Sequence, residues 1–156
     1  MMHREMVSVF VGLGANLGNA QGAVMQAVES IGKLPNTQLI RCSSLYRSAP
    51  VDATGPDYIN AVLHIESRIN AYDLLDAFQD IENLAGRARP YLNAPRTLDV
   101  DMLLFGSASI DSLRLTVPHP RMRARAFVLR PLSELAPHLV SDVDLRKLDD
   151  QLIQKI

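Results

Sequence analysis

The chain has 156 residues, of which 47% are hydrophobic and 21% are charged. This length allows one domain with a full core, and the composition excludes a fibrous or disordered chain. The net charge of -1 argues against a general nucleic-acid-binding protein, because such proteins carry an excess of basic residues.

The first predicted element is a buried strand over residues 7–13, where a continuous apolar run closes with glycines. The run is too short to cross a membrane, and no signal-peptide cleavage pattern follows it. The single cysteine, Cys42, excludes an internal disulfide and favours a reducing compartment. We therefore expect a cytoplasmic protein that has neither a membrane nor a nucleic acid as a partner.

Two helices are predicted from their capping residues. Asn19 can cap a helix that stops before Pro35, and Asn70 can cap a second helix that stops at Gly86. Asp73 adds a weak capping box to the second helix. The core stripe of that helix, at a period of about 3.6 residues, consists of Leu74, Phe78, Ile81 and Ala85.

The remaining elements mix strands with helices and lack the strict alternation of a doubly wound sheet. They are strands over 39–47, 58–67 and 98–105, a short hairpin up to Val117, a helix beginning within 121–126 and a helical C-terminal tail over 141–156. No repeat or linker divides the chain. We therefore predict an α+β fold in which residues 1–156 form one domain, a sandwich of helices around a sheet.

Asp99 and Asp101 alternate with apolar residues in the predicted strand 98–105. Because strand side chains alternate, both carboxylates point to one face, about 7 Å apart along the chain. Like charges there repel unless a cation lies between them or water screens them. Magnesium suits such an oxygen-only pair, since it keeps positions for water and substrate phosphates. An exposed strand face is the alternative, and the nearby Arg96 favours a metal–phosphate site over it.

Glycines recur in the segment 12–18, directly after the first strand. Glycines at a helix N-terminus can bring free backbone N–H groups close to an anion. The dinucleotide-binding fingerprint, however, has a last gap that is one residue shorter, and no acidic residue closes the following strand. We therefore interpret Gly12, Gly14 and Gly18 as a plain tight turn. A nucleotide-binding oxidoreductase would use these glycines, but it leaves the paired aspartates unexplained.

Three further motifs leave a structural and a functional interpretation open. Arg87 and Arg89 follow a helix end, where they either stabilise the helix C-terminus or clamp phosphates. Gln79 and Glu82 lie on the flank of the second helix, at a boundary position or at the border of a cleft. His119 lies between two prolines, which hold the backbone rigid, so it is either a structural histidine or a side chain held toward a ligand.

Taken together, segments spread over residues 7–140 resemble one enzyme family. They read, in chain order, GLGANLG, SSLYRSAP, DYINAV, QDIENLAGRAR, PRTLDVDMLLFG and LTVPHPRMRARAFVLRPL. This set resembles the 6-hydroxymethyl-7,8-dihydropterin pyrophosphokinases of folate biosynthesis. The PRTLDVD and VPHPRM segments are the most specific to that family.

The resemblance implies an αβα sandwich with a ferredoxin-like core. It also implies transfer of the pyrophosphoryl group of ATP to the hydroxymethyl group of the pterin, giving AMP and the pterin diphosphate. ATP is then the co-substrate, and two magnesium ions bridge its phosphates. By the same analogy the enzyme acts alone, as a monomer.

Site residues follow from the resemblance in three groups. The catalytic residues would be Arg87, Arg96, Asp99 and Asp101, of which the two aspartates also hold the magnesium ions. The ATP-binding residues would be Gln79, Glu82, Arg89, Arg114, Thr116, His119 and Arg125. The pterin-binding residues would be Ser48, Ala49, Val51, Tyr58, Asn60 and Phe127.

The sequence departs from the family pattern at two places. Many relatives carry Arg-Trp-Gly before the Pro-Arg pair, whereas residues 90–94 here read PYLNA and the chain has no tryptophan. Position 49 is alanine, where many relatives have proline. A non-catalytic ferredoxin-like module that senses a ligand is the alternative function. Such a module needs no paired magnesium ligands, so magnesium-dependent ATP binding separates the two.

Overall fold

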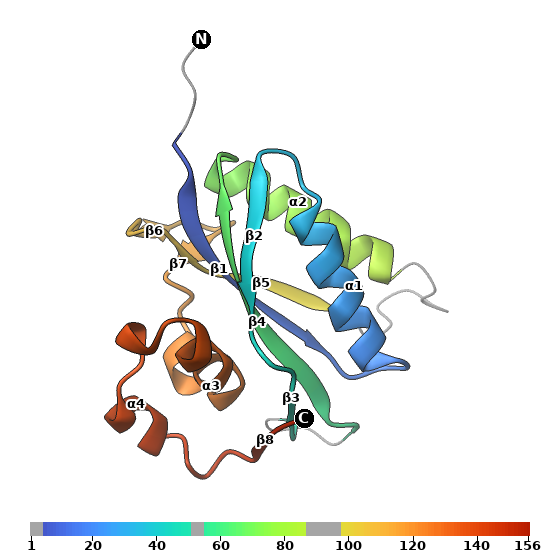
Figure 1. Cartoon of the computed structure of the whole chain (residues 1–156), viewed down its shortest axis with the longest axis vertical. Coiled ribbons are helices and arrows are strands. Elements are labelled where there is room, and N and C mark those ends of the chain that lie inside the picture. Colours follow the sequence, from blue (N-terminus) through green and yellow to red (C-terminus); the bar gives the residue numbers. More distant parts are fainter. Residues whose placement is uncertain (1–4, 51–54, 87–97) are drawn as a thin grey trace.

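The computed structural model describes residues 5–50, 55–86 and 98–156 (Figure 1). The strands are β1 (Val7–Ala15), β2 (Thr37–Cys42), β3 (Tyr46–Ser48), β4 (Tyr58–Ser67), β5 (Asp99–Phe105), β6 (Ile110–Asp111), β7 (Thr116–Val117) and β8 (Ile153–Lys155). The helices are α1 (Ala20–Gly32), α2 (Ala71–Ala85), α3 (Ala126–Leu135) and α4 (Asp142–Arg146), with 3-10 turns at Met122–Ala124 and Pro137–Leu139.

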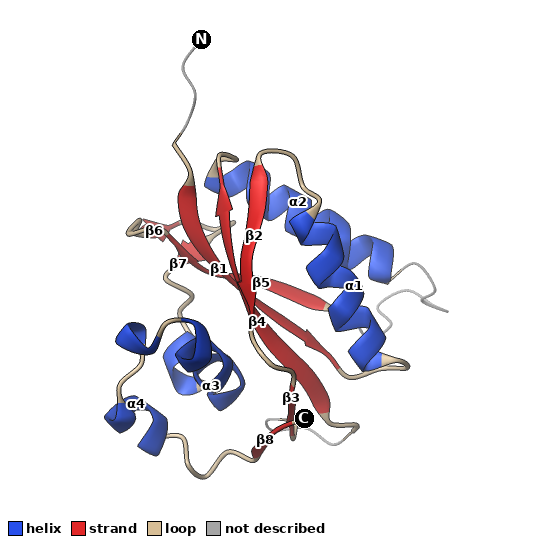
Figure 2. Ribbon diagram, in the orientation of Figure 1, coloured by secondary structure: helices blue, strands red, loops and turns tan. Residues whose placement is uncertain are grey.

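The main sheet is antiparallel and has the strand order β5-β1-β4-β3-β8, with β2 also pairing with β4. Helices α1 and α2 cover one face of this sheet, and α3 lies on the opposite face (Figure 2). Taken without β3, the order β5-β1-β4-β2 and the sequence β1-α1-β2-β4-α2-β5 are those of a ferredoxin-like core. The predicted α+β sandwich with a ferredoxin-like core is confirmed.

Each face of the sheet has its own apolar core, because side chains alternate along each strand. On β1, Val9, Val11 and Leu13 pack toward α1 and α2, whereas Phe10 packs toward α3. A bulge in β5 shifts this alternation. Phe10 pairs with Leu104 and Val11 pairs with Met102, so Leu103 between them has no partner in the ladder. We call the face that carries Phe10 the α3 face.

Both predicted helix caps are confirmed. The side chain of Asn19 accepts a hydrogen bond from Gly22 N at 3.0 Å, and that of Asn70 accepts one from Asp73 N at 2.9 Å. The weak capping box of α2 is only half formed, since the carboxylate of Asp73 accepts from the side-chain amide of Asn70. The predicted stripe of α2 is buried at Leu74, Phe78 and Ile81, but the expectation for Ala85 is wrong, because this residue is exposed.

The predicted strand 39–47 is interrupted in the structure: β2 ends at Cys42 and β3 begins at Tyr46. At the break, Ser43 N donates to Val62 O at 2.9 Å, while the hydroxyl of Ser43 accepts from Val62 N at 2.9 Å. A side chain thus replaces a backbone group of the ladder. The replacement lets the chain turn from the β2 edge to the β3 position, where it borders the cavity described below.

The prediction of a helical tail over 141–156 is wrong for most of its length. Only α4 is helical, and its N-terminus has a complete capping box between Ser141 and Asp144. The chain then returns to the sheet, where β8 pairs with β3. Leu148 is buried, but Leu152 and Ile156 are exposed, so the apolar spacing of the tail does not form one buried helix face.

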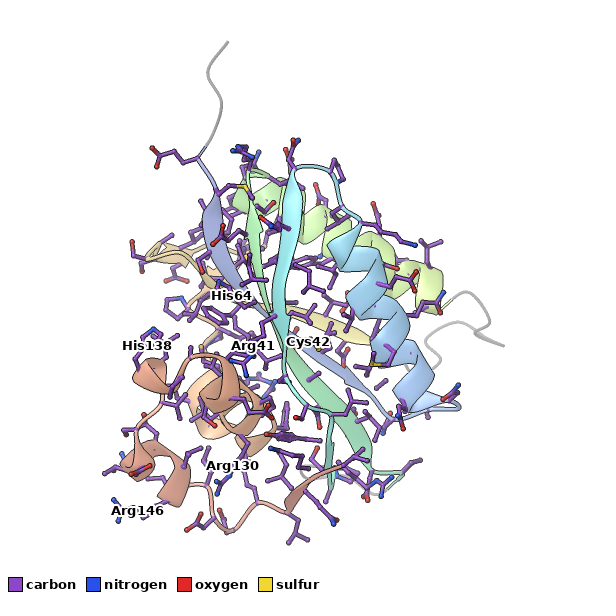
Figure 3. All side chains as sticks on the ribbon, viewed as in Figure 1. Arg41, Cys42, His64, Arg130, His138 and Arg146 are labelled. Atoms are coloured by element: carbon purple, nitrogen blue, oxygen red, sulfur yellow. The ribbon has the colours of Figure 1, made fainter. Side chains whose placement is uncertain are left out.

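Helix α3 is attached to the sheet by the carboxylate of Glu134. The hydroxyl of Tyr46 donates to Oε1, and the backbone N–H and hydroxyl of Ser44 donate to Oε2 at 3.2 and 3.1 Å. Arg41 reaches from β2 toward α3 (Figure 3) and donates to Glu134 O at 3.2 Å. These contacts fix the C-terminal half of α3 against β2 and β3. Among the described helices, none is both long and apolar enough to cross a bilayer.

Candidate active site

A cavity of about 490 Å³ lies on the α3 face of the sheet. Its floor is formed by β1, β4 and β5, and its walls by the residues after β3 and by the start of α3. The volume falls in the range of small-molecule binding sites. The cavity is lined by residues from distant parts of the chain, including Asn60, Asp99 and Phe127.

The floor of the cavity is a row of paired residues across three strands. Gly14 of β1 pairs with Asp99 of β5 on one side and with Asn60 of β4 on the other. Since neighbouring strands lie roughly 5 Å apart, the backbones of Asp99 and Asn60 are separated by about 10 Å. Two carboxylates therefore lie at one end of the floor and an amide at the other, with glycine between them.

Gly12 and Gly14 lie inside β1, so their interpretation as part of a tight turn is wrong. A Cβ atom on Gly14 would stand 3.1 Å from Nδ2 of Asn60, and one on Gly12 would stand 3.4 Å from the side chain of Leu103. The turn itself is at Gly18, which has a φ of 56°. The glycines at positions 12 and 14 thus leave space above the sheet, and their spacing of two in an apolar strand is the signal that could have revealed it.

Asp99 and Asp101 are half-buried and share the α3 face, as predicted. Within the described residues no group of three or more histidine, cysteine or acidic side chains is placed to hold a metal ion. Two carboxylates suit magnesium, which uses few protein ligands and keeps positions for water and phosphates. The donor set therefore fits the predicted magnesium ions. Between the two aspartates, Val100 N donates to Oε2 of Glu82 at 2.8 Å, so α2 holds this part of β5.

At the other end of the floor, the amide of Asn60 is buried and oriented by Ser48. Asn60 is 3% exposed, and the hydroxyl of Ser48 donates to its Oδ1 at 2.6 Å. This bond leaves Nδ2 on the side of Gly14. Ala49, Pro50 and Tyr58 also line the cavity.

The start of α3 supplies cationic and aromatic side chains. Arg125 and Phe127 both line the cavity, and the guanidinium carbon of Arg125 lies 5.2 Å from the centroid of the Phe127 ring. Arg121 lines the cavity as well, although it was not among the predicted site residues. Its place in a cluster of arginines at positions 121, 123, 125 and 130 was the available signal. Two guanidinium groups thus border the cavity that holds the two aspartates.

His119 lies next to this cavity but does not line it. Burial lowers the pKa of its imidazole, as do the charges of Arg125 and Arg121, while Asp101 opposes the shift. Its Nδ1 accepts a hydrogen bond from Arg121 N at 3.1 Å, which assigns the proton of the neutral ring to Nε2. The ring can therefore donate a hydrogen bond through Nε2 at neutral pH.

Several predicted ATP-binding residues lie away from the cavity in the structure. The guanidinium of Arg114 pairs with Asp76 of α2 and lies 5.6 Å from the centroid of the Tyr72 ring. Gln79, Glu82 and Thr116, like His119, do not line the cavity either. Arg87, Arg89, Arg96 and Val51 lie outside the described residues.

Comparison with known proteins places these features in a family. The family model of 7,8-dihydro-6-hydroxymethylpterin-pyrophosphokinase (HPPK) matches residues 10–137. A 2-amino-4-hydroxy-6-hydroxymethyldihydropteridine pyrophosphokinase of Pseudomonas aeruginosa is 46% identical over 84% of this chain and 82% of its own length. Its counterpart in Haemophilus influenzae is 43% identical over 86% of this chain and 85% of its own length. The chain belongs to the HPPK family.

The structural comparison agrees with the HPPK fold. The crystal structure of Plasmodium falciparum HPPK-DHPS with pterin and p-hydroxybenzoate matches with a TM-score of 0.68 at 12% identity. The match covers 88% of this chain but only 41% of that one, so the chain spans less than half of the Plasmodium protein. At this identity the likeness concerns the fold alone. The match to the HPPK family model, over residues 10–137, includes the row of Gly14, Asn60 and Asp99. It ends before the C-terminal segment that carries β8.

Proposed function

We propose that the chain transfers the pyrophosphoryl group of ATP to the hydroxymethyl group of 6-hydroxymethyl-7,8-dihydropterin, giving AMP and the pterin diphosphate, a step of folate biosynthesis. The observation that carries the proposal is the floor of the cavity. Paired carboxylates lie at one end and an oriented amide at the other, about 10 Å apart across β1. A pterin on the amide can thus extend its hydroxymethyl group toward phosphates held at the carboxylates.

The amide end suits a pterin. An asparagine side chain offers both donors and an acceptor, which matches the alternating hydrogen-bonding edge of the pterin ring. Since Ser48 donates to Oδ1 of Asn60, the Nδ2 donors remain for the ligand. Phe127 lines the same cavity and offers an aromatic face, and Tyr58 and Ala49 form the adjoining wall.

The carboxylate end suits magnesium and a polyphosphate. We propose that Asp99 and Asp101 hold two magnesium ions, which when bound neutralise charge on the ATP phosphates. Arg125 and Arg121 add positive charge on the opposite wall and orient the phosphates through planar guanidinium donors. Attack of the hydroxyl on the β-phosphorus depends on this charge neutralisation and on in-line positioning more than on covalent catalysis.

The remaining site residues belong to the proposal through the sequence resemblance. By that resemblance Gln79, Glu82, Arg114, Thr116 and His119 would bind the nucleotide. Helix α2, which carries Gln79 and Glu82, and strand β7, which carries Thr116, both contact β5. Arg87, Arg89 and Arg96 would act on the phosphates, and Val51 would complete the pterin wall. We further propose that residues 1–156 act as one cytoplasmic, monomeric pyrophosphokinase domain.

Product analysis tests the proposal directly. The purified protein is mixed with ATP, magnesium and 6-hydroxymethyl-7,8-dihydropterin, and the products are separated by chromatography. AMP together with a pterin diphosphate, both lost when magnesium is chelated, is the expected result. ADP as the product would identify a simple kinase instead. Binding of the pterin without any turnover would favour the ligand-sensing module.

A further inference from the structure

The first turn of α3 is capped by a side chain from the C-terminal segment. Arg125, the residue before α3, makes no capping hydrogen bond with its own side chain. Instead, Oε1 of Gln151 accepts from Ala126 N at 2.8 Å. Nε2 of Gln151 donates to Ala124 O at 2.9 Å. One amide thus holds the backbone on both sides of Arg125.

We call these two hydrogen bonds of the Gln151 amide the bracket. It holds a backbone segment whose residues line the cavity. Arg125 is held in an extended conformation, with a φ of -125° and a ψ of 114°, between the two bonded neighbours. Phe127 follows directly in the first turn of α3. The side chain of Gln151 itself lines the cavity, together with Arg125 and Phe127. A change in the bracket therefore moves groups that face the ligand.

Gln151 is held in place by a hydrogen bond within the C-terminal segment and by the attachment of the next residue to Ala49, on the other wall of the cavity. Its own N–H donates to Leu148 O at 3.0 Å, and Leu148 is buried. The next residue, Leu152, accepts through its carbonyl from Ala49 N at 3.3 Å, and β8 then pairs with β3. The C-terminal segment therefore links the wall at Ala49 to the start of α3.

We propose that Gln151 is a positioning residue that sets Arg125 and Phe127 relative to the wall formed by Ala49. The roles of Arg125 and Phe127 as ligand-binding groups rest on the proposed function. The hydrogen bonds of Gln151 do not depend on that function. The alternative is a cap that only stabilises the fold. Such a cap would change the melting temperature and leave substrate affinities unchanged at a temperature well below melting.

The test compares Gln151→Met with Gln154→Met. Methionine keeps the length of the side chain and removes both hydrogen-bonding groups. Gln154 is an exposed residue of β8 and serves as the matched control. We expect Gln151→Met to raise the Kd of the pterin and the KM of ATP, the former roughly tenfold or more, because small displacements of positioning groups are costly. The control variant should keep the wild-type values.

Hydrogen exchange of the Ala126 amide in the substrate-free protein gives a second readout. The amide should exchange faster in Gln151→Met than in the wild type and Gln154→Met. Gln151→Glu keeps an acceptor for this amide beside a helix N-terminus, so its Ala126 amide should remain protected. Gln151→Glu loses the donor to Ala124 O, so it should still raise the pterin Kd, and this variant tests the positioning role even if Gln151→Met unfolds.

The outcomes separate the two proposals. Unchanged exchange at Ala126 in Gln151→Met overturns the bracket, and faster exchange with unchanged Kd and KM overturns the positioning role. If the wild-type protein binds the pterin but forms no AMP, the proposed function fails, while the ratio of pterin Kd values still decides the role of Gln151. A wild-type protein that binds neither ligand overturns both.

Discussion

Arg125 covers one face of the Phe127 ring, with its guanidinium carbon 5.2 Å from the ring centroid. Both side chains come from the start of α3 and both line the cavity. A pterin that stacks on the covered face must displace the guanidinium, which then lies free to meet the phosphates. Stacking on that face would therefore couple pterin binding to phosphate binding, because displacing Arg125 from the Phe127 ring also makes its guanidinium available to the phosphates.

Replacing Phe127 with leucine should weaken pterin binding. Loss of an aromatic partner removes about 0.5–1.5 kcal/mol beyond the buried area, so we expect the pterin Kd to rise roughly tenfold. Calorimetric titration with the pterin measures this change. Tyr72→Leu is the matched control, since Arg114 lies over the Tyr72 ring at 5.6 Å outside the cavity. An equal loss of pterin affinity in both variants would contradict a specific role of Phe127.

Gly14→Ala should also impair the pterin end of the cavity. The added Cβ would stand 3.1 Å from Nδ2 of Asn60 and would push the amide from the position that Ser48 sets. We expect the KM for the pterin to rise roughly tenfold in steady-state assays. Gly32→Ala is the control, because its Cβ would meet Leu39 at an ordinary 3.6 Å. This control should keep its KM, because Gly32 is the last residue of α1 and lies outside the cavity.

Asp101→Asn should reduce kcat far more than it alters folding. The change keeps the shape of the side chain but removes a charge from the proposed magnesium site, so we expect a loss of roughly 100-fold or more. The half-saturating magnesium concentration should rise as well. Asp111→Asn, at an exposed position of β6, is the matched control. Wild-type turnover in Asp101→Asn would remove this residue from the metal site.

The contact between Tyr46 and Glu134 should make stability depend on pH. Burial opposes ionisation of Glu134, but hydrogen bonds from Tyr46 and Ser44 and the charge of Lys155 outweigh it and lower its pKa below 4.5. A carboxylate with a lowered folded-state pKa stabilises the fold above its unfolded-state pKa, and this contribution is lost as pH falls through the folded-state value.

Tyr46→Phe and Glu134→Gln test this dependence. Each should lower the free energy of unfolding at neutral pH by about 1–3 kcal/mol, because Tyr46→Phe removes a buried hydroxyl that donates to the carboxylate and Glu134→Gln removes the charge that accepts from it. The difference from the wild type should shrink as pH falls below 4.5. Urea unfolding across that range measures it. A difference that stays constant with pH would show that the ionised carboxylate is not the stabilising partner.

Structural features that depend on residues close together in the sequence could be predicted, whereas those that depend on contacts between distant segments could not. The caps Asn19 and Asn70 were predicted correctly because a cap acts over three residues. The strand 58–67 was predicted with its observed bounds. The break at Ser43 could not be predicted, since it depends on a hydroxyl that bonds to Val62 on another strand.

The same distinction applies to the site. The motifs around Asp99, Asn60 and Phe127 were expected to form one site, and all three line the same cavity. Gln151 carried no signal, because its bonding partners lie 25 and 27 residues away in the chain. The tail around it has an apolar spacing that fits a helix, but pairing with β3 forms a strand there instead.

The bulge at Leu103 divides β5 into two segments with opposite phase. Asp99 and Asp101 follow one alternation, and Leu104 and Phe105 follow another that is shifted by one residue. Because Leu103 is the extra residue, deleting it would leave one regular alternation that keeps Asp101 on the α3 face and Phe105 in the core under α1 and α2. A residue inserted between Asp101 and Met102 would instead turn Asp101 toward that core. The strand should therefore tolerate loss of the bulged residue more easily than an insertion beside the two aspartates.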